Sequence, residues 1–156
     1  MTYPDCPGES TKKGYEGWIP VHGINFEARA SVAPNATGTA RNTGKGEFGD
    51  IHLELMMDKS FNVMLSNCRN AKVANDVTIK CVETVNNRNI ETYVVELKKV
   101  RVTNVNPLFR DNLREGSYSS SLNYARAQFT FMDTDQETGD ATGTIPCTVD
   151  RIADTD

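Results

Sequence analysis

The sequence predicts a mainly β protein, a single β-barrel-like domain of antiparallel strands with one short flanking α-helix and a long extended loop. Apolar and polar side chains alternate in several segments, which is the period of a half-buried strand. Only one segment has helical spacing, and one long stretch is rich in glycine, asparagine and small residues. Strand-rich chains with this pattern form sandwiches or barrels.

Length and charge limit the organisation and the partners. The chain has 156 residues and no internal repeat, so we expect one domain over residues 1–156, with the extended loop at 31–49 and the helix at 60–69. The formal net charge is -4. Binding to nucleic acid independently of its sequence requires an excess of basic residues, so nucleic acid is not an expected partner.

The first residues lack the basic start and apolar run of a secretory signal peptide, and no apolar run is long enough to span a membrane. We therefore expect a protein made in the cytoplasm, without membrane insertion. Cysteines in that compartment normally stay reduced. We expect Cys68 and Cys81 to be free core residues, whereas the sequence does not place Cys6 and Cys147.

The clearest strand lies at residues 51–57, and an earlier strand region is predicted at 18–30. Between them, residues 31–49 have little to bury, and a loop of that length in a compact domain is usually functional or mobile. A hairpin is predicted around the turn at residues 86–89, and a closing strand is predicted around Ile145, Cys147 and Val149.

Two predicted strands change phase by one residue. The first change falls at Lys98-Lys99 and indicates a β-bulge, and the second falls at Tyr124-Ala125. Strands with apolar residues on two faces can contact a neighbouring subunit as well as their own core.

The predicted helix has apolar residues at i, i+3, i+4 and i+7. They are Phe61, Met64, Leu65 and Cys68. Ser60 stands where its hydroxyl could serve as the N-cap.

No catalytic or metal motif is recognisable. The two histidines, His22 and His52, have no partner at a ligand spacing and are interpreted as polar face residues. The acidic residues Asp133, Asp135 and Glu137 lack the remaining ligands of a calcium loop, which favours a solvated turn. The serines at 117–121 lack a nucleophile-elbow motif. We expect no enzymatic activity, no cofactor and no metal.

Several short segments of the sequence occur in the same order as in a known protein family. They are Gly8-Glu9-Ser10-Thr11, Gly17-Trp18-Ile19-Pro20-Val21, Gly44-Lys45, Ile51-His52-Leu53, Asp58-Lys59-Ser60, Leu65-Ser66-Asn67-Cys68, Val77-Thr78-Ile79-Lys80, Tyr93-Val94-Val95-Glu96-Leu97-Lys98-Lys99-Val100, Val105-Asn106-Pro107, Ser121-Leu122-Asn123-Tyr124-Ala125 and Gln128-Phe129-Thr130-Phe131. Together they resemble the Hcp family, the haemolysin-coregulated proteins that build the inner tube of bacterial type VI secretion systems. The two ends of the chain depart from the family pattern, at Pro4, Cys6 and Pro7 and at Ile145-Pro146-Cys147.

The resemblance implies a structural tube subunit that forms hexameric rings, which stack into a tube for delivery of effectors into target cells. It also implies a spike protein of the VgrG type, a contractile sheath and effector proteins as partners, export through type VI secretion to the extracellular space or a target cell, and a role in virulence. The alternatives are a monomeric β-barrel binding module, a tail-tube-like protein of another contractile injection system, and a hydrolase that gathers a histidine, an acid and a serine in one pocket.

The two assembly surfaces expected from the sequence are a ring interface at the phase changes and a stacking loop. The ring interface candidates are Lys98, Lys99, Tyr124 and Arg126. The stacking candidates, which offer donors and acceptors among small residues, are Asn35, Thr37, Arg41, Asn42 and Lys45. The alternative for this loop is simple disorder.

Overall fold

A computed structural model describes residues 1–30, 46–135 and 137–152, and it is mainly β, as predicted. One antiparallel sheet, strongly curled into a half-barrel, forms most of the molecule. The elements in chain order are β1 (Val21–Asn25), β2 (Ala28–Arg29), β3 (Glu47–Phe48), β4 (Ile51–Met56), α1 (Ser60–Arg69), β5 (Val73–Val85), β6 (Arg88–Leu108), the 3-10 turn η2 (Leu113–Glu115), β7 (Ser117–Asn123), β8 (Arg126–Thr134) and β9 (Ala141–Asp150).

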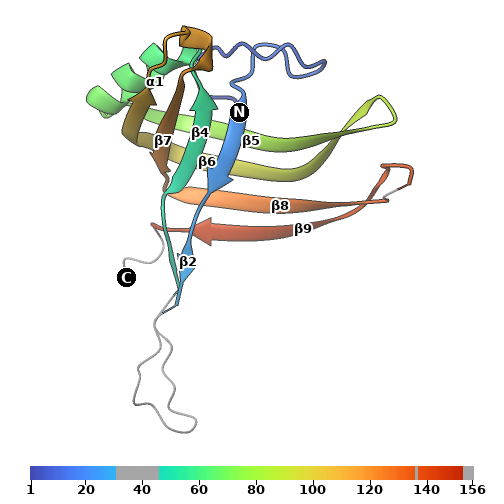
Figure 1. The fold of residues 1–156 in the computed structure, drawn as a ribbon. Helices are drawn as coiled ribbons and strands as arrows, with labels where there is room; N and C mark the ends of the chain where they lie inside the picture. Colours follow the sequence, from blue (N-terminus) through green and yellow to red (C-terminus); the bar gives the residue numbers. More distant parts are fainter. Residues whose placement is uncertain (31–45, 136, 153–156) are drawn as a thin grey trace, which may run out of the picture.

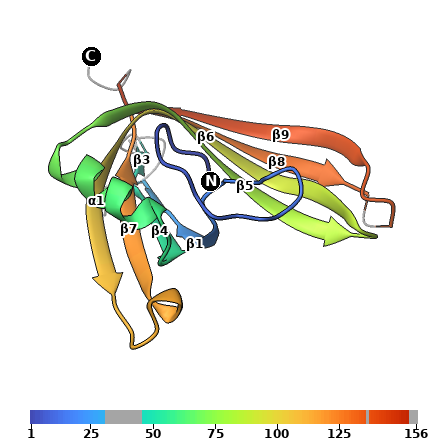
Figure 2. The same cartoon turned by 90° about the horizontal axis from the view of Figure 1, so that it is seen from above.

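The long strand β6 connects two parts of the sheet. The strand order is β1-β4-β7-β6-β8-β9, and β5 also pairs with β6. Residues 101–108 of β6 pair with β7, whereas residues 93–98 pair with β8. We call β1, β4, β7 and residues 101–108 the body, and β5, β8, β9 and residues 88–98 the arm. The body and the arm diverge from a common corner (Figures 1 and 2).

The core lies in the angle between the body and the arm. Strand β4 alternates as predicted, because Ile51, Leu53 and Leu55 are buried and the residues between them are exposed. The N-terminal segment and α1 lie on this inner side (Figure 2). Residues 1–20 form no strand and make only isolated bridges, such as Thr2 with Thr78.

A close approach explains the glycine at the start of the first family-like segment. A Cβ atom on Gly8 would collide with the backbone carbonyl group of Trp18. The segment is held in place by a hydrogen bond from the Gly8 amide to the Gly17 carbonyl oxygen (2.8 Å) and by one from the Met1 amine to the Ile19 carbonyl oxygen (2.8 Å). Only glycine permits this approach of two backbones.

The predicted hairpin is confirmed as β5 and β6. Its turn residues Asn86 and Asn87 both have positive φ (49° and 60°), which matches the tight turns that asparagine favours. The predicted closing strand is confirmed as β9, which pairs with β8 along its length. Because β9 is the last strand of the sheet, Pro146 lies on an edge strand, where a missing backbone N–H is tolerated.

The strand region predicted at 18–30 is shorter in the structure, where only Val21–Asn25 and Ala28–Arg29 are strands. The prediction that the loop extends to Gly49 was wrong at its end. Glu47–Phe48 forms β3, which pairs with β2, because Phe48 can pack against the core. Residues 31–45 of the predicted loop lie outside the described residues.

The helix has the predicted bounds, but Ser60 is not its N-cap. Lys59 holds that position, and the Asp58 carboxylate accepts hydrogen bonds from the Ser60 amide (2.8 Å) and the Ser60 hydroxyl. The hydroxyl of the buried Ser60 also lies 2.7 Å from the Tyr118 hydroxyl oxygen. The carboxylate therefore caps the helix, and the serine attaches its first turn to β7.

The four cysteines are free. Cys6 is buried, and burial raises the pKa of its thiol to about 11. Cys147 is exposed. Cys68 packs against the core but is only partly buried, as is Cys81, so the expectation of core positions holds only in part. Among the described residues there is no helix long and apolar enough to cross a membrane.

Replacing Tyr118 by Phe tests the attachment of the helix. The change Tyr118→Phe removes the hydroxyl that bonds to Ser60, and we expect the free energy of unfolding to fall by about 1 kcal/mol in urea denaturation. The matched control is Tyr3→Phe, because the Tyr3 hydroxyl is buried without a partner among the described residues. Equal losses in both variants would contradict this account.

Candidate functional site

The two phase changes predicted from the sequence face each other at the corner of the sheet. β7 ends at Asn123 and β8 begins at Arg126, so Tyr124 and Ala125 connect the two strands that pair with β6. The Ala125 amide donates to the Lys98 carbonyl oxygen (3.1 Å). Lys99 has a φ of 51°, and both Lys98 and Lys99 are exposed between buried neighbours. The phase change in β6 is therefore confirmed, and it marks the point where β6 exchanges β8 for β7. The β-bulge predicted there is wrong, because the register shifts lie between Val102 and Asn104 against β7 and between Cys81 and Val82 of β5.

A network around Asp50 holds the corner together. Its carboxylate accepts hydrogen bonds from Asn123 Nδ2 (2.8 Å), Arg151 Nη1 (3.2 Å) and Thr103 Oγ1 (3.3 Å). The Arg151 amide also donates to the Ala125 carbonyl oxygen (2.8 Å). One half-buried acid thus connects the start of β4, both halves of the bend and the end of β9.

The four ring interface candidates gather around this corner, but they differ in exposure. Lys98 pairs with Asp76, and Arg126 Nε lies 2.6 Å from Asp150 Oδ2. Tyr124 is only 2% exposed, and its ring lies under the Arg151 guanidinium group at 5.0 Å. Burial raises the pKa of Tyr124, and the Arg151 charge opposes this effect. Tyr124 can therefore not contact another subunit directly and can only pack under the exposed residues that do.

The inner face of the arm is apolar along the strands. Its part near the corner is buried in the core of the protein, and the apolar surface continues from there toward the tip. Paired residues form cross-strand rows, and the row nearest the corner is buried. Its members are Val77, Leu97, Ala127 and Val149. Two rows further toward the tip, Phe131 is 49% exposed and its partner Ile145 is 65% exposed.

Phe26 stacks on Phe129 with 4.8 Å between ring centroids, so the middle row is partly covered. The analysis of the sequence did not single out Phe131 and Ile145 as site residues. The signal available was their in-phase alternation with Phe129 and Cys147 in two strands, which places them on one face but does not say what covers it.

The outer face of the body is polar. His52 Nδ1 lies 2.8 Å from Ser121 Oγ, and the cross-strand partner of Glu54 is Ser119. These residues line a shallow pocket, so a histidine, an acid and serines do share one site. However, a serine nucleophile requires a base that a third group orients, and no described carboxylate is hydrogen-bonded to His52. The geometry is that of a cross-strand hydrogen bond between β4 and β7.

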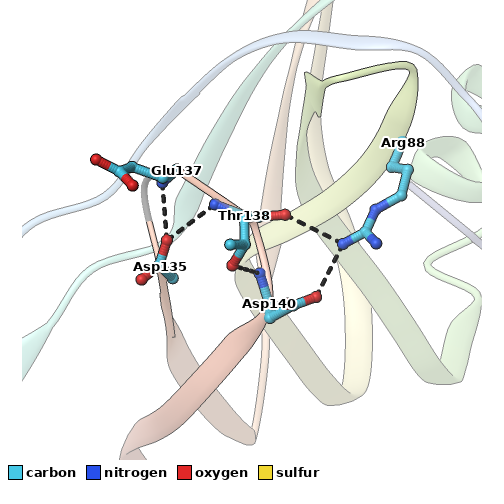
Figure 3. A network of polar contacts seen from close by, with 5 residues as sticks. All are labelled: Arg88, Asp135, Glu137, Thr138 and Asp140. Carbon is cyan, nitrogen blue, oxygen red and sulfur yellow. Dashed lines mark hydrogen bonds and ion pairs between the residues drawn. The ribbon is translucent and has the colours of Figure 1, made fainter.

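The tip of the arm joins two hairpins, as Figure 3 shows. Arg88 donates to the Thr138 carbonyl oxygen (3.1 Å) and to the Asp140 carboxylate (2.9 Å). The Asp135 carboxylate accepts from the amides of Glu137 (2.8 Å) and Thr138 (2.9 Å), which is the solvated turn that the sequence predicted. Within the described residues, no three His, Cys, Asp or Glu side chains are grouped to hold a metal ion.

The stacking candidates cannot be placed in the same way. Asn35, Thr37, Arg41, Asn42 and Lys45 lie outside the described residues. Their described flanks, β2 and β3, pair with each other, with Ala28 opposite Phe48 and Arg29 opposite Glu47.

Comparison with known proteins gives one family. The family model described as type VI secretion system effector, Hcp, matches residues 1–131. No curated protein matches. The curled sheet with the helix α1 is the Hcp fold, and the protein is a structural subunit of the type VI secretion tube class. The chain belongs to the Hcp family.

Solved structures agree with this fold. A type six secretion system protein has a TM-score of 0.88 at 18% identity, over 97% of this chain and 94% of that one. A double mutant of Hcp1 from the E. coli EAEC 042 pathovar has a TM-score of 0.76 at 18% identity, over 94% and 89%. Hcp1 from Salmonella typhimurium has a TM-score of 0.75 at 14% identity, over 97% and 93%.

Removing the Asp50 carboxylate tests the corner network. We expect Asp50→Ala to lower the free energy of unfolding by about 1–3 kcal/mol, because Asn123 and Arg151 lose their acceptor in a half-buried site, whereas Thr103 can still donate to the Ser121 carbonyl oxygen. The matched control is Asp76→Ala, which removes only an exposed ion pair to Lys98 and should cost at most about 1 kcal/mol. Thermal unfolding of both variants measures the difference, and similar losses would refute the special role of Asp50.

Proposed function

We propose that the chain assembles into hexameric rings and that the rings stack into a tube that delivers effectors into target cells. The observation that carries the proposal is the uncovered apolar inner face of the arm. Phe131 and Ile145 lie in one row with the half-buried Cys81 and Tyr93, two rows beyond a fully buried row, so the apolar surface continues past the core to the edge strand β9. A neighbouring subunit would bury it, with a gain of about 25 cal/mol per Å² of apolar surface.

A ring of six subunits requires heterologous contacts, because an isologous contact joins the same surface of only two subunits. Such contacts close into a ring when the rotation between subunits allows it. Lys98, Lys99 and Arg126 are proposed as polar contacts of the ring at the corner, apart from the apolar patch of Phe131 and Ile145, and Tyr124 would support them from below.

Stacking of rings is assigned to the segment between β2 and β3. Asn35, Thr37, Arg41, Asn42 and Lys45 are proposed to contact the adjacent ring, since they offer donors and acceptors among small residues. The further partners proposed from family membership are a spike protein of the VgrG type, a contractile sheath and effector proteins. Export would then occur through the secretion tube itself, to the extracellular space or a target cell. The role is structural and needs no catalytic step.

A charge on the uncovered face tests the ring. We expect the unmodified protein to elute as a hexamer or larger in size exclusion with light scattering, and Ile145→Asp to shift it to a monomer, because a buried unpaired carboxylate is costly. The control Leu108→Asp introduces the same charge at an exposed aliphatic residue on β6, away from the arm. A monomeric unmodified protein from micromolar to near-millimolar concentration would overturn the proposal in favour of a monomeric binding module.

Shortening the segment between β2 and β3 tests the stack. We expect deletion of residues 35–45 to leave circular dichroism and the hexamer unchanged, while electron microscopy shows fewer and shorter stacks. The control replaces the same residues by an equal number of glycines and serines, which keeps the length and removes the polar groups. Unfolding of the deletion variant would mean that this segment belongs to the core.

A further inference from the structure

The two ends of the arm carry opposite charge. At the corner, the exposed or half-exposed cations are Lys98, Lys99, Arg101, Arg126 and Arg151. At the tip, the exposed acids are Asp133, Asp135, Glu137 and Asp140, with Arg88 as a cation among them. Strand β8 runs from one end to the other through nine residues, so the ends are about 30 Å apart.

The corner holds an open pocket of about 400 Å³ between the two parts of the sheet. Lys99, Arg101 and Arg151 line it, and Tyr124 lies at its wall. Arg151 is paired with Asp50, but neither Lys99 nor Arg101 forms an ion pair with any described residue. Two cations beside one half-neutralised cation give the pocket a positive potential on a protein whose net charge is -4.

The wall of this pocket also includes a residue with an unpaired polar group. The hydroxyl of Tyr124 is buried and has no hydrogen-bond partner among the described residues. Leaving a buried donor unpaired costs about 1–3 kcal/mol, so such groups are rare unless a ligand or water completes them. A carboxylate that enters the pocket would meet one lysine and two guanidinium groups beside the wall that Tyr124 forms.

The tip supplies acids in a fixed arrangement. The backbone N–H of Thr138 is the main cause that lowers the pKa of Asp135, and the hydrogen bond from Arg88 lowers the pKa of Asp140, so both stay ionised at neutral pH. The carboxylates of Asp133 and Glu137 form no hydrogen bond or ion pair with the described residues. The ion pair between Arg88 and Asp140 joins the two hairpins at this end of the arm, next to Glu137 (Figure 3).

We propose that the corner pocket of one subunit receives a carboxylate of the arm tip of the next subunit, Asp133 or Glu137. The inference rests on the proposed ring and names the polar contact that fixes its direction. The tip cannot reach the pocket of its own chain, because β8 and β9 hold the two ends of the arm apart. A contact between different ends of two copies is head-to-tail, which is the kind that builds rings. Charge-assisted hydrogen bonds in a partly enclosed site give such a contact its specificity.

Charge reversal tests the contact in two variants of the full chain. The corner variant carries Lys99→Glu and Arg101→Glu, and the tip variant carries Asp133→Lys and Glu137→Lys. Each variant alone places like charges at the contact. In light scattering, we expect its hexamer to require a protein concentration at least about tenfold higher than the hexamer of the unmodified protein. Mixed in equal amounts, the variants should assemble again, because each tip then meets a corner of opposite charge and an even-numbered ring can alternate them.

The matched control carries Lys59→Glu and Arg110→Glu, which change the net charge as the corner variant does but lie on exposed residues away from both ends of the arm. It should assemble like the unmodified protein. Circular dichroism of every variant checks that the fold is kept. Normal assembly of the corner variant would overturn the proposal and leave the ring intact. Failure of the mixture to assemble would show that the tip is not the occupant of the pocket. If the unmodified protein itself formed no ring, that result would instead overturn the proposed function.

Discussion

The shared strand β6 is the constraint on which the rest of the structure depends. It pairs with β8 in the arm and with β7 in the body, so the angle between the two parts is set where its partner changes. The positive φ of Lys99 and the short connection at Tyr124 and Ala125 allow this change. The carboxylate of Asp50 then fixes the angle by joining groups from three segments. The core, the open inner face and the corner pocket all follow from that geometry.

Much of the fold could be predicted because it is encoded in local periodicity. The alternation in β4, the hairpin of β5 and β6 and the bounds of α1 depend on residues that are near in sequence. The N-cap was misassigned because the side chains of Ser60 and of Asp58, two residues before it, can both accept hydrogen bonds from the first backbone amides of the helix. The choice of Asp58 depends on the contact between Ser60 and Tyr118, which are far apart in sequence.

The candidate site could be predicted only in part, for the same reason. Phase changes in two strands located the corner, since a shift of one residue is visible in the sequence. Sequence could not show that Tyr124 is buried, or that the tip acids and the corner cations lie at opposite ends of one arm, because both depend on strand pairing. The uncovered rows of the arm likewise follow from the position of β9 at the end of the sheet.

The edge position of β9 also bears on how the subunit avoids aggregation before it assembles. An edge strand next to exposed apolar residues is a template on which further strands can add without limit. Pro146 lies in the middle of this strand, opposite Thr130, and has no N–H to offer an incoming strand. The open edge can therefore accept side-chain packing from a neighbour, while continuous backbone pairing along it is interrupted. A proline at this position thus limits uncontrolled strand addition on the free subunit.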